Sequence, residues 1–239
     1  MKEKILIIIP AYNEEKNILN TCSTIDEFNK KNKKKIKLDY IVINDGSKDS
    51  TKEILEKNNI NHINLICNLG IGGAVQTGYK YAYNNGYDIA IQFDGDGQHD
   101  VNYVEDIVNP IVNKKANMVV GSRFVTKTKE GFKSTAARRF GINIISFFIK
   151  LKTKKKVYDV TSGFRSIDRN VMKLFIENYP VEYPEPISTV NVLKHNLLVD
   201  EVPVIMKERQ GGKSSIHTWK NVYYMINVIL SIILTKGNK

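Results

Sequence analysis

IAIQFDGDGQH, residues 89–99, is the stretch that decides the fold. Residues 89–93 have the length and apolar continuity of a strand that is buried on both faces, as in parallel sheets. Two aspartates separated by one glycine follow at once. Because side chains alternate along an extended chain, Asp94 and Asp96 are expected to point the same way. Paired carboxylates at a strand end favour a hard-cation site, although an ordinary acidic turn would contain the same residues.

Strands and helices alternate on both sides of this stretch. Before it, the pattern predicts a strand at 5–9, a helix at 17–31, a strand at 39–44, a helix at 51–58, a strand at 62–67 and a helix from 68 to about 85. After it, the pattern predicts a helix at 101–114, a strand at 118–121, a helix at 136–151, a rigid turn at 183–186 that places Glu185 before a short helix, and a strand at 197–206. This alternation is typical of βαβ units, so we expect an α/β fold with a mostly parallel sheet. Ligands bind beyond the carboxyl ends of strands in such sheets, where the acidic stretch lies.

Length, charge and cysteine content limit the class of protein. The 239 residues, of which 42% are hydrophobic, suit one good-sized core. The net charge of +11 indicates an anionic partner. The lysine clusters at 30–37 and 150–156 lack the interleaved aromatic residues of nucleic-acid readers, so we expect no nucleic-acid partner. Cys22 and Cys67 have neither metal-site nor disulfide spacing, which favours a reducing compartment.

The glycine-rich run NLGIGGA, residues 68–74, does not match a dinucleotide fingerprint. It follows the third predicted strand rather than the first, and its spacing differs from GxGxxG. Gly70, Gly72 and Gly73 are compatible with a helix start that approaches a nucleotide. Close packing of that helix would require the same residues, and the sequence leaves both interpretations open.

The end of the chain predicts an amphipathic helix. Apolar residues recur at helical spacing over 219–233, beside a narrower polar stripe. The predicted helix at 136–151 is also widely apolar and continues into the basic run KTKKK. We therefore divide the chain into a catalytic domain at 1–216 and a helix at 217–239 that docks on the core, a membrane surface or a membrane partner. No run reaches the roughly 18 apolar residues of a membrane span, so we expect a cytoplasmic protein, peripheral at the inner face of the cell membrane.

Seven short motifs occur in a characteristic order. They are PAYNEE (10–15), NDGSKDST (44–51), NLGIGGA (68–74), DGDGQH (94–99), GSRF (121–124), TSGFR (161–165) and ERQGGKSSI (208–216). In this order they resemble the family 2 glycosyltransferases of the GT-A fold, and most closely the polyprenyl-phosphate sugar transferases. The resemblance implies a Rossmann-like sheet flanked by helices, a nucleotide-sugar donor, a divalent metal (Mg²⁺ or Mn²⁺) and inversion at the sugar carbon. Short forms of this kind resemble transferases that work with a small separate membrane protein.

The resemblance also implies roles for individual residues. The expected donor-binding residues are Pro10, Tyr12, Glu14, Asp45, Gly70, Asp94, Arg123 and Lys213. The expected metal ligands are Asp94, Asp96 and Gln98, the expected catalytic residues are Asp96, Asp159, Glu185 and Arg209, and the expected ligands of the acceptor phosphate are Arg138 and Arg139. Asn44 departs from the family pattern, because relatives usually have aspartate there.

These roles predict an inverting glycosyltransferase that moves a sugar from UDP-glucose or UDP-N-acetylglucosamine to a polyprenyl phosphate, for cell-surface glycan synthesis. The metal and the cationic loop around Arg209 would neutralise the leaving diphosphate. A phosphate acceptor is already anionic and needs no strong base, whereas a hydroxyl of a lipid-linked glycan would need Asp159 or Glu185 to take its proton. A catalytically silent sugar-nucleotide binder that scaffolds a membrane complex is a third possibility, against which the intact acidic pair argues.

Overall fold

The alternation of strands and helices agrees with the sequence pattern in most places. The computed structural model describes residues 3–32, 36–125, 135–207 and 218–235. Its elements are β1 (Ile5–Ala11), α1 (Ile18–Lys31), β2 (Leu38–Asn44), α2 (Thr51–Lys57), β3 (His62–Asn64), α3 (Gly70–Asn84), β4 (Ile89–Gln92), η1 (Val101–Tyr103), α4 (Val104–Val112), β5 (Met118–Ser122), α5 (Ala136–Thr153), β6 (Arg165–Asp168), α6 (Arg169–Glu177), α7 (Pro184–Lys194), β7 (Val199–Pro203) and α8 (Thr218–Leu234).

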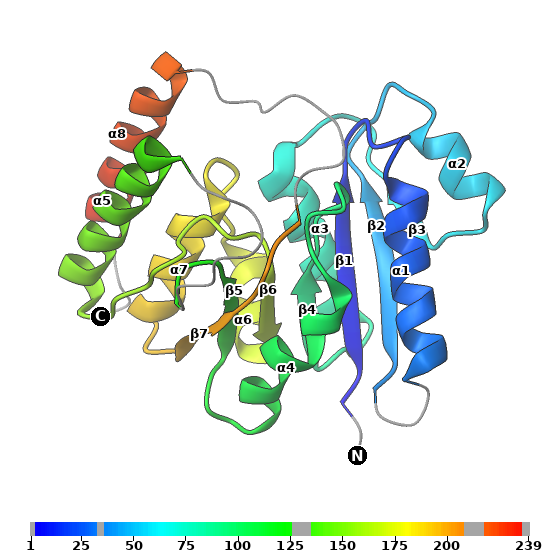
Figure 1. Ribbon diagram of the computed structural model, residues 1–239, viewed down its shortest axis with the longest axis horizontal. Helices are drawn as coiled ribbons and strands as arrows, with labels where there is room; N and C mark the ends of the chain where they lie inside the picture. The colour runs from blue at the N-terminus through cyan, green and yellow to red at the C-terminus, as the bar shows by residue number, and fades with distance from the viewer. Residues whose placement is uncertain (1–2, 33–35, 126–134, 208–217, 236–239) are drawn as a thin grey trace.

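A seven-stranded sheet in the order β3-β2-β1-β4-β6-β5-β7 forms the centre of the protein (Figure 1). β1 pairs in parallel with β2 and β4, β2 with β3, and β5 with β7. β6 runs antiparallel to both of its neighbours, β4 and β5. The mostly parallel sheet predicted from the sequence is therefore confirmed.

β6 and α6 are the two elements that the sequence pattern does not predict. β6 is buried, but it begins with Arg165 and Ser166, so it lacks the apolar signal of the other strands. α6 follows without a loop, because Asp168 ends the strand and caps the helix by accepting a hydrogen bond from the Val171 N–H (2.9 Å).

The two faces of the sheet are covered by different helices (Figure 1). Ile7 and Ile9 of β1 pack with residues of α1 and α4, whereas Leu6 and Ile8 pack with residues of α3 and α6. Because both faces of β1 are buried, apolar residues are favoured at successive positions rather than at alternate ones. This burial explains the continuous apolar runs that identify the central strands in the sequence.

Helices α5 and α8 lie side by side, beyond one end of the sheet (Figure 1). They share a third hydrophobic cluster with α7, to which α5 contributes Ile142, Ile145 and Ile149, α7 contributes Val190, and α8 contributes Val228 and Ile232. Val228 and Ile232 are fully buried. The segment 217–239, predicted to dock on a membrane or partner, thus also contributes to a hydrophobic core.

Candidate active site

The acidic loop, residues 94–99, follows β4 at the carboxyl ends of the parallel strands and folds back on itself. The Asp94 backbone N–H donates a hydrogen bond to Nδ1 of His99 (2.9 Å). Oδ1 of Asp96 accepts a hydrogen bond from the Gln98 N–H (3.1 Å), and Gly97 has a φ of +77°, which glycine adopts without strain. Asp96 is 7% exposed, whereas the side chain of Asp94 is 32% exposed. The loop is therefore a defined turn that presents two carboxylates.

His99 lies behind these carboxylates, and the sequence motif gives it no role. Its ring stacks on Phe164 at 4.9 Å between centroids and meets Phe93 edge to face at 5.4 Å. Burial lowers the pKa of His99 to about 4, against the nearby negative charge of Asp96 and together with the positive charge of Arg123. The ring is therefore neutral at physiological pH. Because Nδ1 accepts a hydrogen bond, Nε2 carries the proton, 3.6 Å from Oδ2 of Asp94.

Arg123 and Asp159 form a buried ion pair. Nε of Arg123 donates to Oδ2 of Asp159 and Nη2 donates to Oδ1, both at 2.8 Å. The Arg123 backbone N–H adds a third hydrogen bond, to Oδ2 (3.0 Å), and Nη2 also donates to Oγ1 of Thr161 (3.1 Å). Asp159 is fully buried. Since both carboxylate oxygens accept from Arg123, this geometry favours a positioning role for Asp159 over that of a proton acceptor.

A polar cluster made by Gln92, Arg165 and Glu185 lies near Asp94. Glu185 is in the first turn of α7, and burial raises the pKa of its carboxyl group, although the charge of Arg165 opposes the shift. The guanidinium of Arg165 is held by hydrogen bonds within the protein, because it donates to the Glu185 carbonyl and to the hydroxyls of Ser188 and Thr189. Gln92 is buried close to Glu185, yet neither atom of its amide makes a hydrogen bond of normal geometry. Glu185 is thus the carboxyl group of this site best suited to hold or exchange a proton.

Gly163 lies against Asp94 and Gln92 of this site. A methyl group at this position would lie 3.0 Å from Nε2 of Gln92 and 3.0 and 3.1 Å from the two oxygens of Asp94. The Asp94 carboxylate therefore lies against the backbone of the TSGFR motif. The absence of a side chain at Gly163 therefore allows the Asp94 carboxylate to lie there, a contact that the sequence alone does not indicate.

The loops after β1, β2 and β3 are tied together where the donor nucleoside is expected. The Asp45 N–H donates to the carbonyl of Ala11 (2.8 Å), and Oδ1 of Asp45 accepts from the Leu69 N–H (2.7 Å). Burial raises the pKa of Asp45, while the N–H groups of Leu69 and Gly70 oppose that shift. The Glu14 N–H donates to Oγ1 of Thr51 (2.9 Å). Asp45 is therefore held in place between two loops.

Three other expected donor residues differ in exposure and role. Pro10 lies inside β1 and is buried, whereas Tyr12 just beyond the strand is 43% exposed. Gly70, the first residue of α3, has a φ of +77° and open space where a side chain would be. Gly72 differs, because an added methyl group would lie 2.5 Å from the carbonyl oxygen of Val181. The glycine-rich run therefore combines an open helix start at Gly70 with close helix packing at Gly72.

The two arginines expected at the acceptor lie at the start of α5. Arg138 is exposed, and its N–H is bound by the capping hydroxyl of Thr135 (3.3 Å). The guanidinium of Arg139 lies 3.7 Å from the ring centroid of Phe124, over which the guanidinium of Arg123 also lies, at 5.2 Å. Nη1 of Arg139 is buried and makes no hydrogen bond to the described residues. The structure thus brings Arg139 near the ion pair.

The cationic loop is only partly described. Arg209 and Lys213 lie outside the described residues. Just before them, the Lys207 N–H donates to the carbonyl of Gln98 (2.9 Å), and Nζ of Lys207 lies 3.5 Å from Oδ2 of Asp100. The chain that leads into this loop is therefore anchored on the acidic loop.

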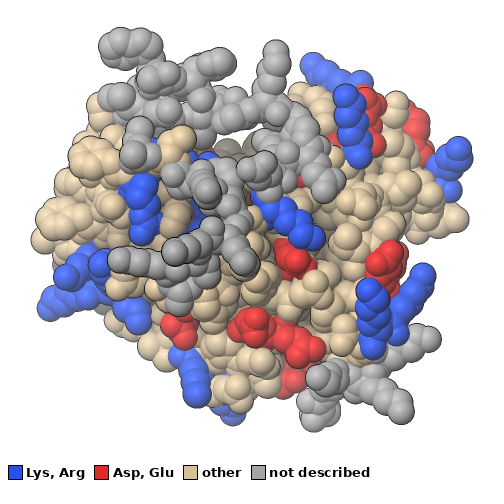
Figure 2. All heavy atoms as spheres, viewed as in Figure 1, with Lys and Arg blue, Asp and Glu red and all other residues tan. Residues whose placement is uncertain are grey.

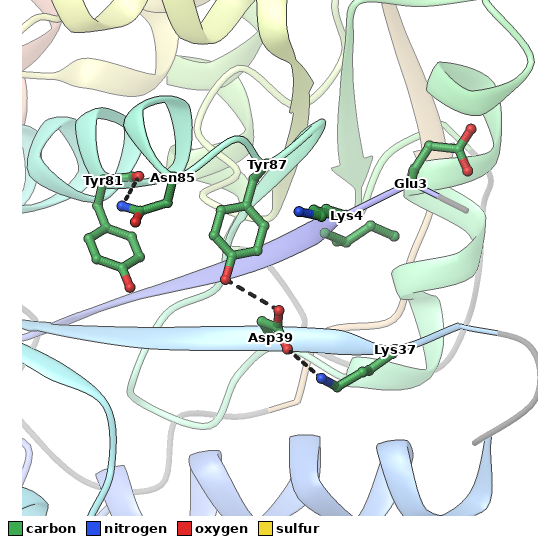
Figure 3. A pocket seen from close by; sticks show the side chains of 8 residues that line it. Glu3, Lys4, Lys37, Asp39, Tyr81, Asn85 and Tyr87 are labelled. Carbon is green, nitrogen blue, oxygen red and sulfur yellow. Dashed lines mark hydrogen bonds and ion pairs between the residues drawn. The ribbon is translucent and has the colours of Figure 1, made fainter. Parts of the chain in front are cut away.

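A separate hollow of about 430 Å³ lies near the amino ends of β1 and β2 (Figure 3). Polar side chains that line it bind each other: Asp39 accepts a hydrogen bond from the Tyr87 hydroxyl (3.2 Å) and forms an ion pair with Lys37 (3.2 Å). Both partners meet on Asp39 in the close-up view (Figure 3). This hollow is at the other end of the strands from the acidic loop, and we assign the chemistry to the loop.

Sequence comparison supports one family over most of the chain. A model described as glycosyl transferase family 2 matches residues 6–175. The UDP-N-acetylglucosamine–dolichyl-phosphate N-acetylglucosaminyltransferase of Methanococcus voltae is 34% identical over 224 residues, which cover 85% of this chain and 86% of that protein. The dolichyl-phosphate β-glucosyltransferase of Dictyostelium discoideum is 31% identical over 231 residues, which cover 87% of this chain and 67% of that protein.

Structural comparison supports the predicted GT-A fold. The glucosyl-3-phosphoglycerate synthase of Mycobacterium tuberculosis, in a crystal structure with Mn²⁺, UDP and glucosyl-3-phosphoglycerate, matches with a TM-score of 0.69 at 15% identity. The match covers 97% of this chain and 79% of that chain. At this identity the likeness establishes the arrangement of sheet and helices alone.

Proposed function

Because the chain belongs to glycosyltransferase family 2, we propose that it transfers a sugar from a nucleotide sugar to a polyprenyl phosphate. The observation that carries this proposal is the buried Nη1 of Arg139, a cationic group without a hydrogen-bond partner among the described residues. It lies near Arg123, because both guanidinium groups lie over the ring of Phe124. The positive charge of Arg123 also helps to lower the pKa of His99 in the acidic loop. A guanidinium in this position fits an anionic acceptor beside the donor diphosphate. The Methanococcus and Dictyostelium relatives are named for transfer to dolichyl phosphate, which supports this acceptor.

The donor is UDP-N-acetylglucosamine or UDP-glucose: the Methanococcus relative is named for UDP-N-acetylglucosamine, and the Dictyostelium relative for transfer of glucose. The nucleoside binds to Pro10, Tyr12, Glu14 and Asp45, at the loops that the hydrogen bonds of Asp45 hold together. The start of α3 at Gly70 offers open space for approach to the donor. We propose that the sugar lies beyond the diphosphate, toward Glu185.

A divalent ion, Mg²⁺ or Mn²⁺, fits the oxygen donors of the acidic loop. Among the described residues no group of three or more His, Cys, Asp or Glu side chains is arranged to hold a metal by itself. Mg²⁺ commonly binds one or two carboxylates together with substrate phosphates, which matches Asp94 and Asp96, with Gln98 as a further oxygen donor. When bound, the ion would supply positive charge to the leaving diphosphate.

The protein's own side chains would then orient the reactants. Asp159 holds Arg123 by hydrogen bonds to both of its carboxylate oxygens, so the guanidinium is preorganised to face a phosphate. Arg209 and Lys213 would add charge on the leaving-group side, and Arg138 and Arg139 would bind the acceptor phosphate. A phosphate acceptor needs no strong base for attack, so proton removal is not required of this site.

A hydroxyl acceptor on a lipid-linked glycan is the second candidate, and Glu185 is the observation that favours it. Its pKa is raised by burial, which makes it a better proton acceptor than a solvated carboxylate. It lies in the polar cluster with Gln92 and Arg165, near Asp94. An acceptor assay with both lipid phosphate and glycan hydroxyl separates the two candidates.

We place the reaction at the cytoplasmic membrane face, with α5 and α8 as the docking surface. Among the described residues no helix is long and apolar enough to cross a bilayer. Exposed apolar side chains on these two helices are Phe140, Phe147, Leu151, Ile226, Leu230, Ile233 and Leu234. Exposed lysines follow at 154–156, and basic side chains gather at the left of Figure 2, where Figure 1 shows α5. Each well-placed lysine contributes about 1 kcal/mol on an anionic membrane; a small membrane protein is an alternative occupant.

The decisive experiment supplies purified protein with polyprenyl phosphate in vesicles and a panel of labelled nucleotide sugars. We expect metal-dependent transfer of one sugar into a lipid fraction that mild acid hydrolyses. Asp96→Ala should abolish this transfer while leaving the fold intact, because Asp96 lies in a loop outside the hydrophobic clusters; loss of its hydrogen bond from the Gln98 N–H should lower the thermal melting temperature only slightly. Near-normal turnover by this variant, or by chelated enzyme, would refute the metal assignment. A wild-type protein that neither transfers nor hydrolyses any donor would instead support a silent scaffold.

A further inference from the structure

His99 closes the acidic loop but is not among the groups expected to react. We propose that His99 is a positioning residue that holds Asp94 in the geometry that binds the divalent metal. The inference rests on the metal site of the proposed function and concerns how Asp94 is held in that site. Two contacts carry it, one to the backbone of Asp94 and one to its carboxylate.

The backbone contact is the stronger of the two. The Asp94 N–H donates to Nδ1 of His99 at 2.9 Å, the usual length for a good hydrogen bond. It joins the first and last residues of the loop, so the backbone of Asp94 cannot rotate without losing this hydrogen bond. Nε2–H then faces Oδ2 of Asp94 at 3.6 Å, which is too long for a strong hydrogen bond but favourable in charge.

The ring itself has little freedom to move. His99 is 6% exposed, and its ring packs against two aromatic rings that also contact each other, Phe93 directly after β4 and Phe164 directly before β6. On its other side, the Asp94 carboxylate lies against Gly163. Asp94 is therefore held between a fixed ring and a backbone segment before any metal arrives. Residues that orient metal ligands in this way typically affect metal affinity by about 10–100-fold.

Three substitutions separate the two contacts. His99→Asn retains an oxygen near the position of Nδ1, which can accept from the Asp94 N–H. His99→Gln retains a donor near the position of Nε2 but lacks an acceptor at the position of Nδ1. His99→Phe keeps an aromatic ring against Phe164 and removes both polar contacts. His195→Gln is the matched control, since His195 bonds the Asn191 carbonyl at the far end of α7 from Glu185.

The measurement is Mn²⁺ affinity of the full chain in the presence of UDP, from the electron paramagnetic resonance signal of free Mn²⁺. We expect His99→Phe and His99→Gln to weaken Mn²⁺ binding by about tenfold or more. His99→Asn should stay within about threefold of wild type, and the control should not change. Kinetics should show the same order as a higher Mn²⁺ requirement, with a smaller change in kcat at saturating Mn²⁺. Thermal melts of each variant identify any loss of fold.

The outcomes are distinguishable. Wild-type Mn²⁺ affinity in folded His99→Phe and His99→Gln variants would overturn the role of His99 and leave the metal site intact. If His99→Phe fails to fold, the comparison of His99→Gln with His99→Asn decides, because both are small polar replacements that differ in which contact they keep. Equal affinity in those two variants would overturn the proposal. A wild-type protein that binds no Mn²⁺ with UDP would overturn the proposed metal site and this inference together.

Discussion

Replacing Asp159 with asparagine is predicted to destabilise the protein by about 3 kcal/mol. Asp159 is 0% exposed and the Arg123 side chain 10% exposed, so the pair is almost wholly out of water. Asparagine keeps one acceptor oxygen and places an N–H₂ group where Arg123 already donates. Removing one partner of a buried ion pair typically costs about 3–5 kcal/mol. We expect the lower end of that range, because one acceptor remains and Arg123 keeps some contact with solvent.

The assay is thermal and urea unfolding at pH 7. In a chain of this size each kcal/mol lowers Tm by roughly 2–4 °C, so the Asp159→Asn variant should melt about 6–12 °C below wild type. Glu56→Gln is the matched control, because Glu56 pairs with Lys52 at 3.7 Å with both side chains 52% exposed. Such surface pairs contribute about 0–1 kcal/mol, so the control should melt close to wild type.

A double-mutant cycle with Arg123→Met tests the reasoning behind this number. If Asp159 acts by holding Arg123, the two substitutions should be strongly non-additive in stability and in transfer rate. A free energy of unfolding of Asp159→Asn within about 1 kcal/mol of wild type would refute the holding role of Asp159. So would effects of Asp159→Asn and Arg123→Met that simply add in the double variant. In the second case Asp159 would act independently of Arg123, as a proton acceptor would.

Three further outcomes follow from the packing of the site and of α8. Gly72→Ala should destabilise the fold by about 1–3 kcal/mol through overpacking. Gly70→Ala should destabilise it by about 1–2 kcal/mol from its positive φ alone, and should also lower donor affinity if the start of α3 meets the donor. Urea unfolding measures the first effect, and UDP titration distinguishes the two variants. Glu185→Gln should match or exceed the wild-type Tm at pH 7 and lose that advantage near pH 4. Because the pKa of Glu185 is raised in the folded state, the folded state binds more protons than the unfolded state, and wild-type stability falls as pH rises from the unfolded pKa through the folded pKa. A variant less stable than wild type at pH 7 would contradict this. Leu230→Ser on the exposed side of α8 should weaken binding to anionic vesicles by about tenfold, whereas Leu198→Ser, at an equally exposed leucine elsewhere, should not; equal effects would argue against docking through α8.

Single substitutions on α8 are the better test of docking because of how the helix packs. Its buried side contributes Val228 and Ile232 to the cluster with α5 and α7. Deleting the segment 217–239 would therefore remove core contacts as well as any membrane contact. A deletion that lost all activity would not tell docking from folding, whereas Leu230 is half exposed and its loss leaves the core in place.

The sequence predicts those parts of the fold whose signal is local. β1 and β4 are recognisable because burial on both faces requires continuous apolar runs, and the position of Asp94 and Asp96 follows from where β4 ends. β6 is not recognisable, because its buried residues include Arg165, whose burial is compensated by hydrogen bonds to α7. These compensating partners lie 20 or more positions away in the sequence, so no local pattern announces that Arg165 can be buried in a strand.

The same distinction applies to the site. Arg123 and Asp159 both stand in recognisable surroundings, yet their pairing joins residues 36 positions apart and needs the sheet order to bring them together. His99 is part of the acidic motif, but its proposed role depends on a ring that folds back to Asp94 and packs against two phenylalanines. Residue types at a strand end indicate which chemistry is possible, whereas the pairs that orient them appear only in three dimensions.

Asn44 extends this argument to a departure from the family pattern. Its Nδ2 donates to Oδ1 of Asn64 (2.7 Å) on the neighbouring strand β3, and its Oδ1 accepts from the Ser47 N–H (3.3 Å). An aspartate could make the second contact but not the first, because two oxygens would then face each other. The amide is therefore explained by its partner in β3, and Asp45, held by the Leu69 N–H, is the carboxylate that we propose for contact with a nucleotide base. The two amides, 20 positions apart, together hold the end of β2 directly before Asp45.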